Sequence, residues 1–217
     1  MSVLDTPVRD AVWAAIDFES TGARPGLGDE PVQVGIAVAD GDRGTPGRFL
    51  RSYLRPAAGV TRTARAVHGI GEAETRDAPA LADLWGGIRE RLSGAVVVAH
   101  GAGTEKRFLR AFPLHGFGPW LDTLALARAV FPNLPEHSLS DVVKAAGVEH
   151  EVRELCPGLD WHDALFDAVA CLVFLRAALD LAGLREAVVG QILALDSSAY
   201  HRRRGVLRTA RDAGWLG

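Results

Sequence analysis

The feature that most constrains the fold of this chain is a continuous apolar run, GAVVVAH, at residues 94–100. β-branched residues favour extended backbone, and a strand that is apolar at consecutive positions is typical of burial on both faces. We therefore predict a central strand here, fully buried within a sheet.

Three further strands are predicted before this run, at residues 11–18, 31–39 and 48–55. The segments between them carry the Gly, Pro and Asp residues of turns, which favours an antiparallel meander. Helical patterns dominate the rest, and we predict helices at residues 79–92, 104–111, 121–130, 139–146, 163–181 and 184 to about 213. Strands first and helices afterwards predict an α/β sandwich with a mixed sheet.

Composition excludes several classes of protein. The chain has 217 residues, 48% hydrophobic and 24% charged, which is ordinary for a soluble globular domain. Its longest apolar run, residues 168–175, is far shorter than a membrane span, and its first residues lack a signal-peptide pattern, so we expect a cytoplasmic protein without a membrane partner. The formal net charge of −3 provides no global attraction for nucleic acid, so a polyanion would have to be attracted locally.

The first strand ends in a pair of acids, in WAAIDFESTG at residues 13–22. Strand side chains alternate between faces, so Asp17 and Glu19 project from the same face at the strand's C-terminal edge. Like charges held this closely raise a pKa, bind a cation, or splay into water. From this stretch alone, a cation site and a solvated strand end are about equally favoured.

Two more acids fall at comparable places. Glu105 follows the buried central strand, and Asp167 lies one turn into the long helix of WHDALFDAVACLVFL. Sites in α/β proteins form at strand ends, so the four carboxylates can converge on one point. Carboxylates are the ligands that Mg²⁺ prefers, and four of them could hold two ions. Taken singly, however, Glu105 is better explained as a complement to a helix dipole.

His162 precedes Asp167 by five residues. On a helix the two would lie roughly 140° apart, so they converge only if His162 belongs to the preceding loop. The sequence CPGLDWHDAL supports such a break, with Asp163 as a helix cap. A loop imidazole close to a water molecule suits a general base.

Three segments, DFESTG, AHGAGTEKRFL and HDALFDA, resemble in this order the three exonuclease motifs of the DEDDh 3′–5′ exonucleases. That family includes the proofreading subunit of bacterial DNA polymerase III, ribonuclease T and oligoribonuclease. The likeness extends over residues 12–181, where ARAVHGI, LDTLALARAVFP and HSLSDVVKAAGV also resemble family segments. It implies a ribonuclease H-like fold with a mixed sheet of about five strands and flanking helices, a nuclease domain at residues 8–182, and a C-terminal helical extension at residues 183–217.

The resemblance also implies roles for individual residues. Metal binding falls to Asp17, Glu19 and Asp167, and the general base is His162. The 3′-terminal nucleotide is bound by Thr21, by the backbone near Phe18, and by His68, which lines the base pocket.

The chain departs from the family pattern in the second motif. Family members carry Asp where this chain has Glu105, and commonly Asn where it has Gly101. The extra methylene of Glu105 moves its carboxylate out by roughly 1.5 Å. Either the helix is set back and Glu105 serves as the fourth acid, or the metal site is loosened and works better with Mn²⁺. We favour the first outcome, because unneutralised buried acids are costly.

The function implied is a metal-dependent exonuclease that uses two Mg²⁺ ions, with Mn²⁺ as a substitute, and releases nucleoside 5′-monophosphates from the 3′ end of single-stranded DNA or RNA. The alternative is a nucleic-acid-binding or polymerase-associated module with catalysis weakened at Glu105. Any proofreading or repair partner would act in trans. The arginines of residues 201–211 favour a solvated helix face over a tail that contacts nucleic acid.

Overall fold

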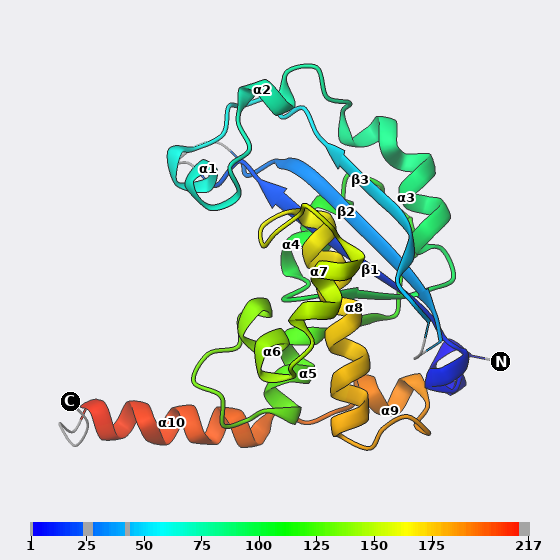
Figure 1. Ribbon diagram of the computed structural model, residues 1–217, viewed down its shortest axis with the longest axis vertical. Coiled ribbons are helices and arrows are strands. Elements are labelled where there is room, and N and C mark those ends of the chain that lie inside the picture. Colours follow the sequence, from blue (N-terminus) through cyan, green and yellow to red (C-terminus); the bar gives the residue numbers. More distant parts are fainter. Residues whose placement is uncertain (1, 24–27, 42–43, 213–217) are drawn as a thin grey trace.

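A single five-stranded sheet, in the order β3-β2-β1-β4-β5, forms the centre of the molecule (Figure 1). This computed structural model describes residues 2–23, 28–41 and 44–212. The strands are β1 (Val12–Ser20), β2 (Pro31–Asp40), β3 (Gly47–Tyr53), β4 (Val96–Ala99) and β5 (Trp120–Asp122). β1, β2 and β3 are antiparallel neighbours, whereas β4 runs parallel to β1 and β5 parallel to β4. The predicted meander and the mixed sheet are confirmed.

Helices cover both faces of this sheet. They are α1 (Arg62–His68), α2 (Glu72–Thr75), α3 (Trp85–Leu92), α4 (Gly103–Leu109), α5 (Thr123–Val130), α6 (Leu139–Ala145), α7 (Glu149–Leu155), α8 (Ala164–Leu181), α9 (Val189–Leu193) and α10 (Ser198–Asp212). Three short 3₁₀ helices are η1 (Val3–Asp5), η2 (Val8–Asp10) and η3 (Leu81–Leu84).

Alternation along the strands divides the core into two parts. Val96 and Val98 of β4 belong to the cluster that contains α8, while Val97 belongs to the cluster on the other face with residues of α3 and α4. All three side chains are at most 1% exposed. Residues 96–99 of the apolar run therefore form a strand buried on both faces, as predicted, although the strand is shorter than the run.

Several predicted boundaries were wrong. Residues 121–122 were predicted as the start of a helix but belong to β5. Asp122 is both the last residue of that strand and the N-cap of α5, where its side chain accepts a hydrogen bond from Leu124 N–H. The helix predicted from residue 184 is two helices, α9 and α10, and its predicted end at residue 213 lies outside the described residues. Helices α1, α2 and α7, which are each at most seven residues long, were not predicted from the sequence. Short helices carry too few turns for a clear hydrophobic period.

The C-terminal segment is only partly separate from the sheet domain. Val189 and Ile192 of α9 are buried in the α8 cluster, and Val8 N–H donates to Ala187 C=O. Helix α10 projects away from the body in Figure 1 and bears Tyr200, whose ring packs against His137. The division at residue 182 stays a prediction. Within the described part of the chain, no helix is both long and apolar enough to span a bilayer.

A close backbone approach fixes the start of α8. A Cβ atom on Gly35 of β2 would lie only 2.1 Å from the carbonyl carbon of Ala164, the first residue of α8. Glycine is therefore required here by contact rather than by backbone angle. This contact sets how closely the first turn of α8 lies against the sheet.

We predict that Gly35→Ala destabilises the protein by about 3 kcal/mol, because the added methyl overlaps helix backbone that cannot move alone. The measurement is the free energy of unfolding in urea. The matched control is Gly86→Ala in α3, where an added Cβ has no atom within 4 Å and the substitution should be neutral or stabilising. Equal unfolding free energies for the two variants would contradict this account of the contact.

Candidate active site

The paired acids lie at the end of β1 that faces the start of α8. Asp17 is paired across the strands with Gly35, the residue that contacts Ala164, and Glu19 is paired with Gln33. Phe18 points to the opposite core cluster, where its ring meets Phe108 edge-on at a centroid distance of 5.4 Å. Only the backbone of Phe18 is therefore next to the acids, and its predicted role in binding the nucleotide stays a prediction.

His162 lies in the loop before α8, as convergence with Asp167 required. Its backbone is left-handed, with φ at 66°, and Asp167 follows in the first helical turn. His162 Nδ1 lies 3.9 Å from Glu19 Oε1. One ligand atom from each of Glu19, His162 and Asp167 lies within 4.8 Å of the other two. Three of the predicted site residues thus meet at one point.

Glu105 approaches the same region from α4. It lies in the first turn and is 4% exposed, and its charge contributes to raising the pKa of Asp17. Neither Glu105 nor Asp17 is part of the 4.8 Å group formed by Glu19, His162 and Asp167. The predicted fourth acid is therefore near Asp17 but is not as close to the histidine side of the cluster.

The turn into α4 explains the glycine of the second motif. Gly101 has a φ of 78°, and its N–H donates to Asp122 Oδ1 over 2.8 Å. Glycine adopts this left-handed conformation without cost, and Asn is among the side chains that tolerate it best. Gly101 thus suits the left-handed backbone of this turn.

The carboxylates disturb one another strongly. Burial, with repulsion from Asp167 and Asp163, raises the pKa of Glu19 to about 8. Burial is also the main reason that the pKa of Asp167 and that of Glu105 are each raised to about 7. Asp17 has its pKa raised well above the ordinary range by burial and by repulsion from Asp167, Glu105 and Glu19. Without a cation, the cluster therefore retains protons close to neutral pH.

Two oxygens of the cluster are buried without a hydrogen-bond partner among the described residues, namely Asp167 Oδ1 and Glu105 Oε2. A buried acceptor that lacks a donor is costly, and a cation satisfies it as well as a donor does. The oxygen-rich donor set, the raised pKa values and these two atoms together fit a divalent cation.

The residues predicted to bind substrate differ in their surroundings. His68, at the end of α1, accepts a hydrogen bond from Ile70 N–H at Nδ1, and its Nε2 lies 3.0 Å from Ser20 C=O, so its ring is fixed beside β1. Thr21 is 2% exposed, and its hydroxyl accepts from Glu30 N–H over 3.1 Å. The Thr21 hydroxyl is therefore engaged in the connection between β1 and β2, and its binding role stays a prediction.

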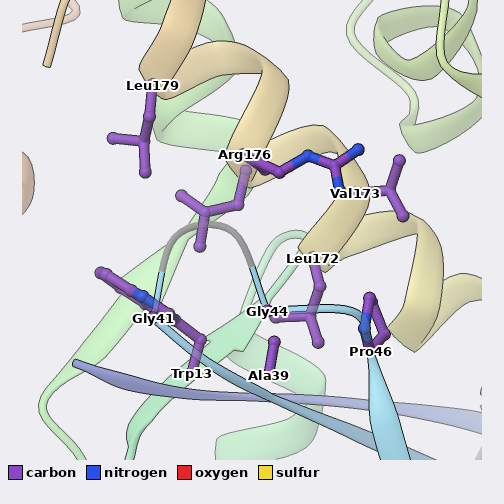
Figure 2. A pocket seen from close by; sticks show the side chains of 10 residues that line it. Trp13, Ala39, Gly41, Gly44, Pro46, Leu172, Val173, Arg176 and Leu179 are labelled. Atoms are coloured by element: carbon purple, nitrogen blue, oxygen red, sulfur yellow. The ribbon is translucent and has the colours of Figure 1, made fainter. Parts of the chain in front are cut away.

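Two hollows in the surface differ in the space that they offer to a ligand. One of them is bordered by His68, His162, Tyr53 and Trp161, and the centre of a water-sized molecule has about 240 Å³ available there. The other lies between α8 and the far end of the sheet (Figure 2). By the same measure it offers only about 10 Å³, room for about one water molecule. Of these two hollows, the one beside the histidines can admit part of a substrate.

Two residues that border the first hollow, Gln33 and Arg51, were not predicted from the sequence. Gln33 and Arg51 both bond the carboxylate of Asp163, which was predicted as a helix cap only. Burial raises the pKa of Asp163, but the hydrogen bonds from Arg51 and Gln33 outweigh it and leave the pKa below its usual range. A glutamine within the apolar strand PVQVGIAV was the signal that could have revealed this contact.

Comparisons with known proteins identify the family of the chain. The family model described as Exonuclease matches residues 14–174. A DNA polymerase III subunit epsilon-like protein of Rhodobacter capsulatus is 33% identical over 182 residues, which cover 81% of this chain and 25% of that relative. The chain therefore corresponds to about a quarter of the length of that relative.

Solved structures show the same fold. Exonuclease X in complex with 5′ overhanging duplex DNA has a TM-score of 0.67 at 24% identity, covering 84% of this chain and 99% of the other. The nuclease domain of 3′hExo, a DEDDh family member bound to rAMP, has a TM-score of 0.66 at 14% identity, covering 84% and 98%. The resemblance drawn from the three motifs is confirmed: the chain belongs to the Exonuclease family and has the ribonuclease H-like fold of the DEDDh exonucleases.

Proposed function

We propose that this protein is a metal-dependent 3′–5′ exonuclease that releases nucleoside 5′-monophosphates from the 3′ end of single-stranded DNA or RNA. The observation that carries the proposal is the meeting of Glu19, His162 and Asp167 within 4.8 Å, at the point where repulsion also raises the pKa of Asp17. Family membership supports the reaction class.

Asp17, Glu19 and Asp167 would hold the cations, with Glu105 as the fourth acid. Two Mg²⁺ ions bound there, or Mn²⁺ in their place, would polarise the phosphodiester and stabilise the leaving 3′ oxygen. Glu105 brings its oxygens in from α4, on the side of Asp17.

His162 is proposed to accept the proton of the attacking water. Its side chain is 54% exposed, so water and substrate can reach the imidazole, whereas the Glu19 side chain is only 13% exposed. The Glu19 carboxylate lies 3.9 Å from His162 Nδ1. Its negative charge would stabilise the positive charge that the imidazole acquires with the proton. His68, the Phe18 backbone and Thr21 would bind the terminal nucleotide.

A partner in trans is part of the proposal. The Rhodobacter relative is described as DNA polymerase III subunit epsilon-like, which supports association with a polymerase or a repair complex. We propose a cytoplasmic location.

A second candidate function is a nucleic-acid-binding module of low activity. It is favoured by one observation, the position of Glu105 outside the group formed by Glu19, His162 and Asp167. Binding of oligonucleotides without release of mononucleotides, under both Mg²⁺ and Mn²⁺, would support this alternative.

The first test is cleavage of 3′-labelled single-stranded oligonucleotides of DNA and RNA with Mg²⁺ or Mn²⁺. We expect labelled mononucleotide from the wild type and a loss of about 100-fold or more in Asp17→Asn, which keeps the shape of the side chain but removes its charge. The control is Arg48→Met: Arg48 lies on β3 and forms an exposed ion pair with Asp40 at the end of β2. This variant should keep full activity. Internal cleavage products that persist in Asp17→Asn would contradict the assignment.

Glu105 decides between the two functions. If it is the fourth acid, Glu105→Ala should lose about 100-fold in kcat, because a ligand to the cation is missing, and Glu105→Asp should retain measurable activity. Both variants are assayed with Mg²⁺ and with Mn²⁺ on the same oligonucleotide. Undiminished cleavage by Glu105→Ala would remove this residue from the site.

The raised pKa values predict a pH-dependent stability of the metal-free protein. The pKa of Glu19 rises from 4.5 to about 8 and that of Asp167 from 3.8 to about 7, so the folded state binds protons that the unfolded state has lost. The free energy of unfolding therefore falls by several kcal/mol as the pH rises from about 4 to 8.

Urea unfolding in the presence of EDTA at pH 5, 6.5 and 8.5 measures this decline. Asp167→Asn should flatten the profile, since one ionising group and its repulsion are gone. Added Mg²⁺ or Mn²⁺ should restore stability most at pH 8.5. A metal-free protein that gains stability over this range would contradict the proposed crowding of acids.

A further inference from the structure

The proposed general base, His162, has a backbone conformation that is stable only with support from neighbouring residues. A left-handed backbone conformation is unfavourable for a residue other than glycine, and His162 adopts it with φ at 66°. Its side chain is 54% exposed, so packing around the ring provides little restraint. The conformation persists only where neighbouring contacts fix it.

Those contacts converge on the next residue, Asp163. Its Oδ2 accepts hydrogen bonds from Arg51 Nη2 over 2.6 Å and from Gln33 Nε2 over 2.9 Å. Its Oδ1 accepts from Leu165 N–H over 3.1 Å and so caps α8. The side chain is 14% exposed. The carboxylate next to His162 is thus bound from three directions.

Gln33 joins this carboxylate to the sheet. It is 1% exposed in β2, directly across from Glu19 in the strand register. Its Oε1 accepts from Ala164 N–H over 2.9 Å, while its Nε2 donates to Asp163. The Gln33 side chain therefore accepts a hydrogen bond from the first turn of α8 and donates one to the capping carboxylate. It does so at the position in the sheet where Gln33 is paired with Glu19.

Arg51 completes the attachment from β3. Its Nε and Nη2 both donate to Asp163, over 2.8 and 2.6 Å to Oδ2, and its guanidinium carbon lies 5.1 Å from the centre of the Tyr53 ring. A planar fork of this kind fixes both position and direction of a carboxylate, which a lysine ammonium cannot do.

We infer that Arg51 and Gln33 are positioning residues of the exonuclease reaction, which hold the His162 imidazole against the acid cluster through the carboxylate of Asp163. The inference rests on the proposed function, in which His162 is the base. Neither residue reaches the acids itself in the contacts described above. Their effect on catalysis therefore passes through the loop.

The kinetic test compares Arg51→Met with Arg48→Met, which removes a similar ion pair, with Asp40, from the same strand. On a 3′-labelled oligonucleotide with Mg²⁺, Arg51→Met should lower kcat by about 10- to 100-fold with KM within about 2-fold, because a misplaced base still allows substrate to bind. Arg48→Met should retain kcat. Arg51→Lys should recover only part of the loss.

A double-mutant cycle separates positioning from general damage. In a His162→Ala background, Arg51→Met should cause no further loss beyond about 2-fold, since there is no base left to misplace. An equal loss in both backgrounds, or no loss in the wild-type background, would overturn the inference. If His162→Ala is as active as the wild type, the assignment of the base fails, while release of mononucleotides still supports an exonuclease.

A second measurement needs no activity and so stands apart from the proposed function. In ¹⁵N relaxation experiments, the amide order parameter of His162 should fall from about 0.85 to below about 0.6 in Arg51→Met and Gln33→Met, but not in Arg48→Met. Unchanged order parameters in both variants would show that Asp163 is held without these residues and would overturn the inference. Spectra of all variants report whether each one is folded.

Discussion

The candidate site depends on the contact between the first turn of α8 and strand β2 at Gly35. Because Gly35 lacks a side chain, the backbone of Ala164 lies directly on the strand. Asp167 of the same helical turn is thereby held beside Asp17, which is the cross-strand partner of Gly35. Glu19 and Gln33 repeat the arrangement two residues along, with Gln33 bonded to Ala164 N–H. One close approach thus places acids from a strand and a helix at the same point.

Placing these acids together lowers the stability of the folded protein when they are charged. Each of the acids Asp17, Glu19, Glu105 and Asp167 has a raised pKa, which shows that the folded protein disfavours its charge. Sites that store unfavourable electrostatics in this way are common where a cation or a reacting group is bound. Asp163 is the contrasting case: it has partners in Arg51 and Gln33, and its pKa is lowered. The same small region therefore contains one carboxylate, that of Asp163, with hydrogen-bond partners that fix the loop. It also contains buried carboxylate oxygens of Asp167 and Glu105 that have no hydrogen-bond partner among the described residues.

Much of this arrangement could be predicted from the sequence. Strand alternation placed Asp17 and Glu19 on one face, the apolar run 94–100 predicted the buried β4, and the break before residue 164 predicted that His162 lies on a loop. What could not be predicted depended on contacts between distant segments. The strand β5 is three residues long and has no periodicity of its own, and Arg51 gains its role only because β3 lies beside the loop before α8. Sequence patterns describe a residue's own element, whereas these roles come from the neighbours that the fold supplies.

The acids come from chain segments that are far apart in the sequence: β1 near the N-terminus, α4 in the middle, and α8 near the end of the domain. No local fragment can assemble the set, so it forms only when the long-range packing of β1, β4 and α8 is complete. Cation binding at the proposed site would therefore be linked to the global folding equilibrium rather than to the order of a single loop. A saturating cation should slow unfolding of the domain as a whole, and hydrogen exchange in the central strands should report its occupancy as directly as exchange at the site itself.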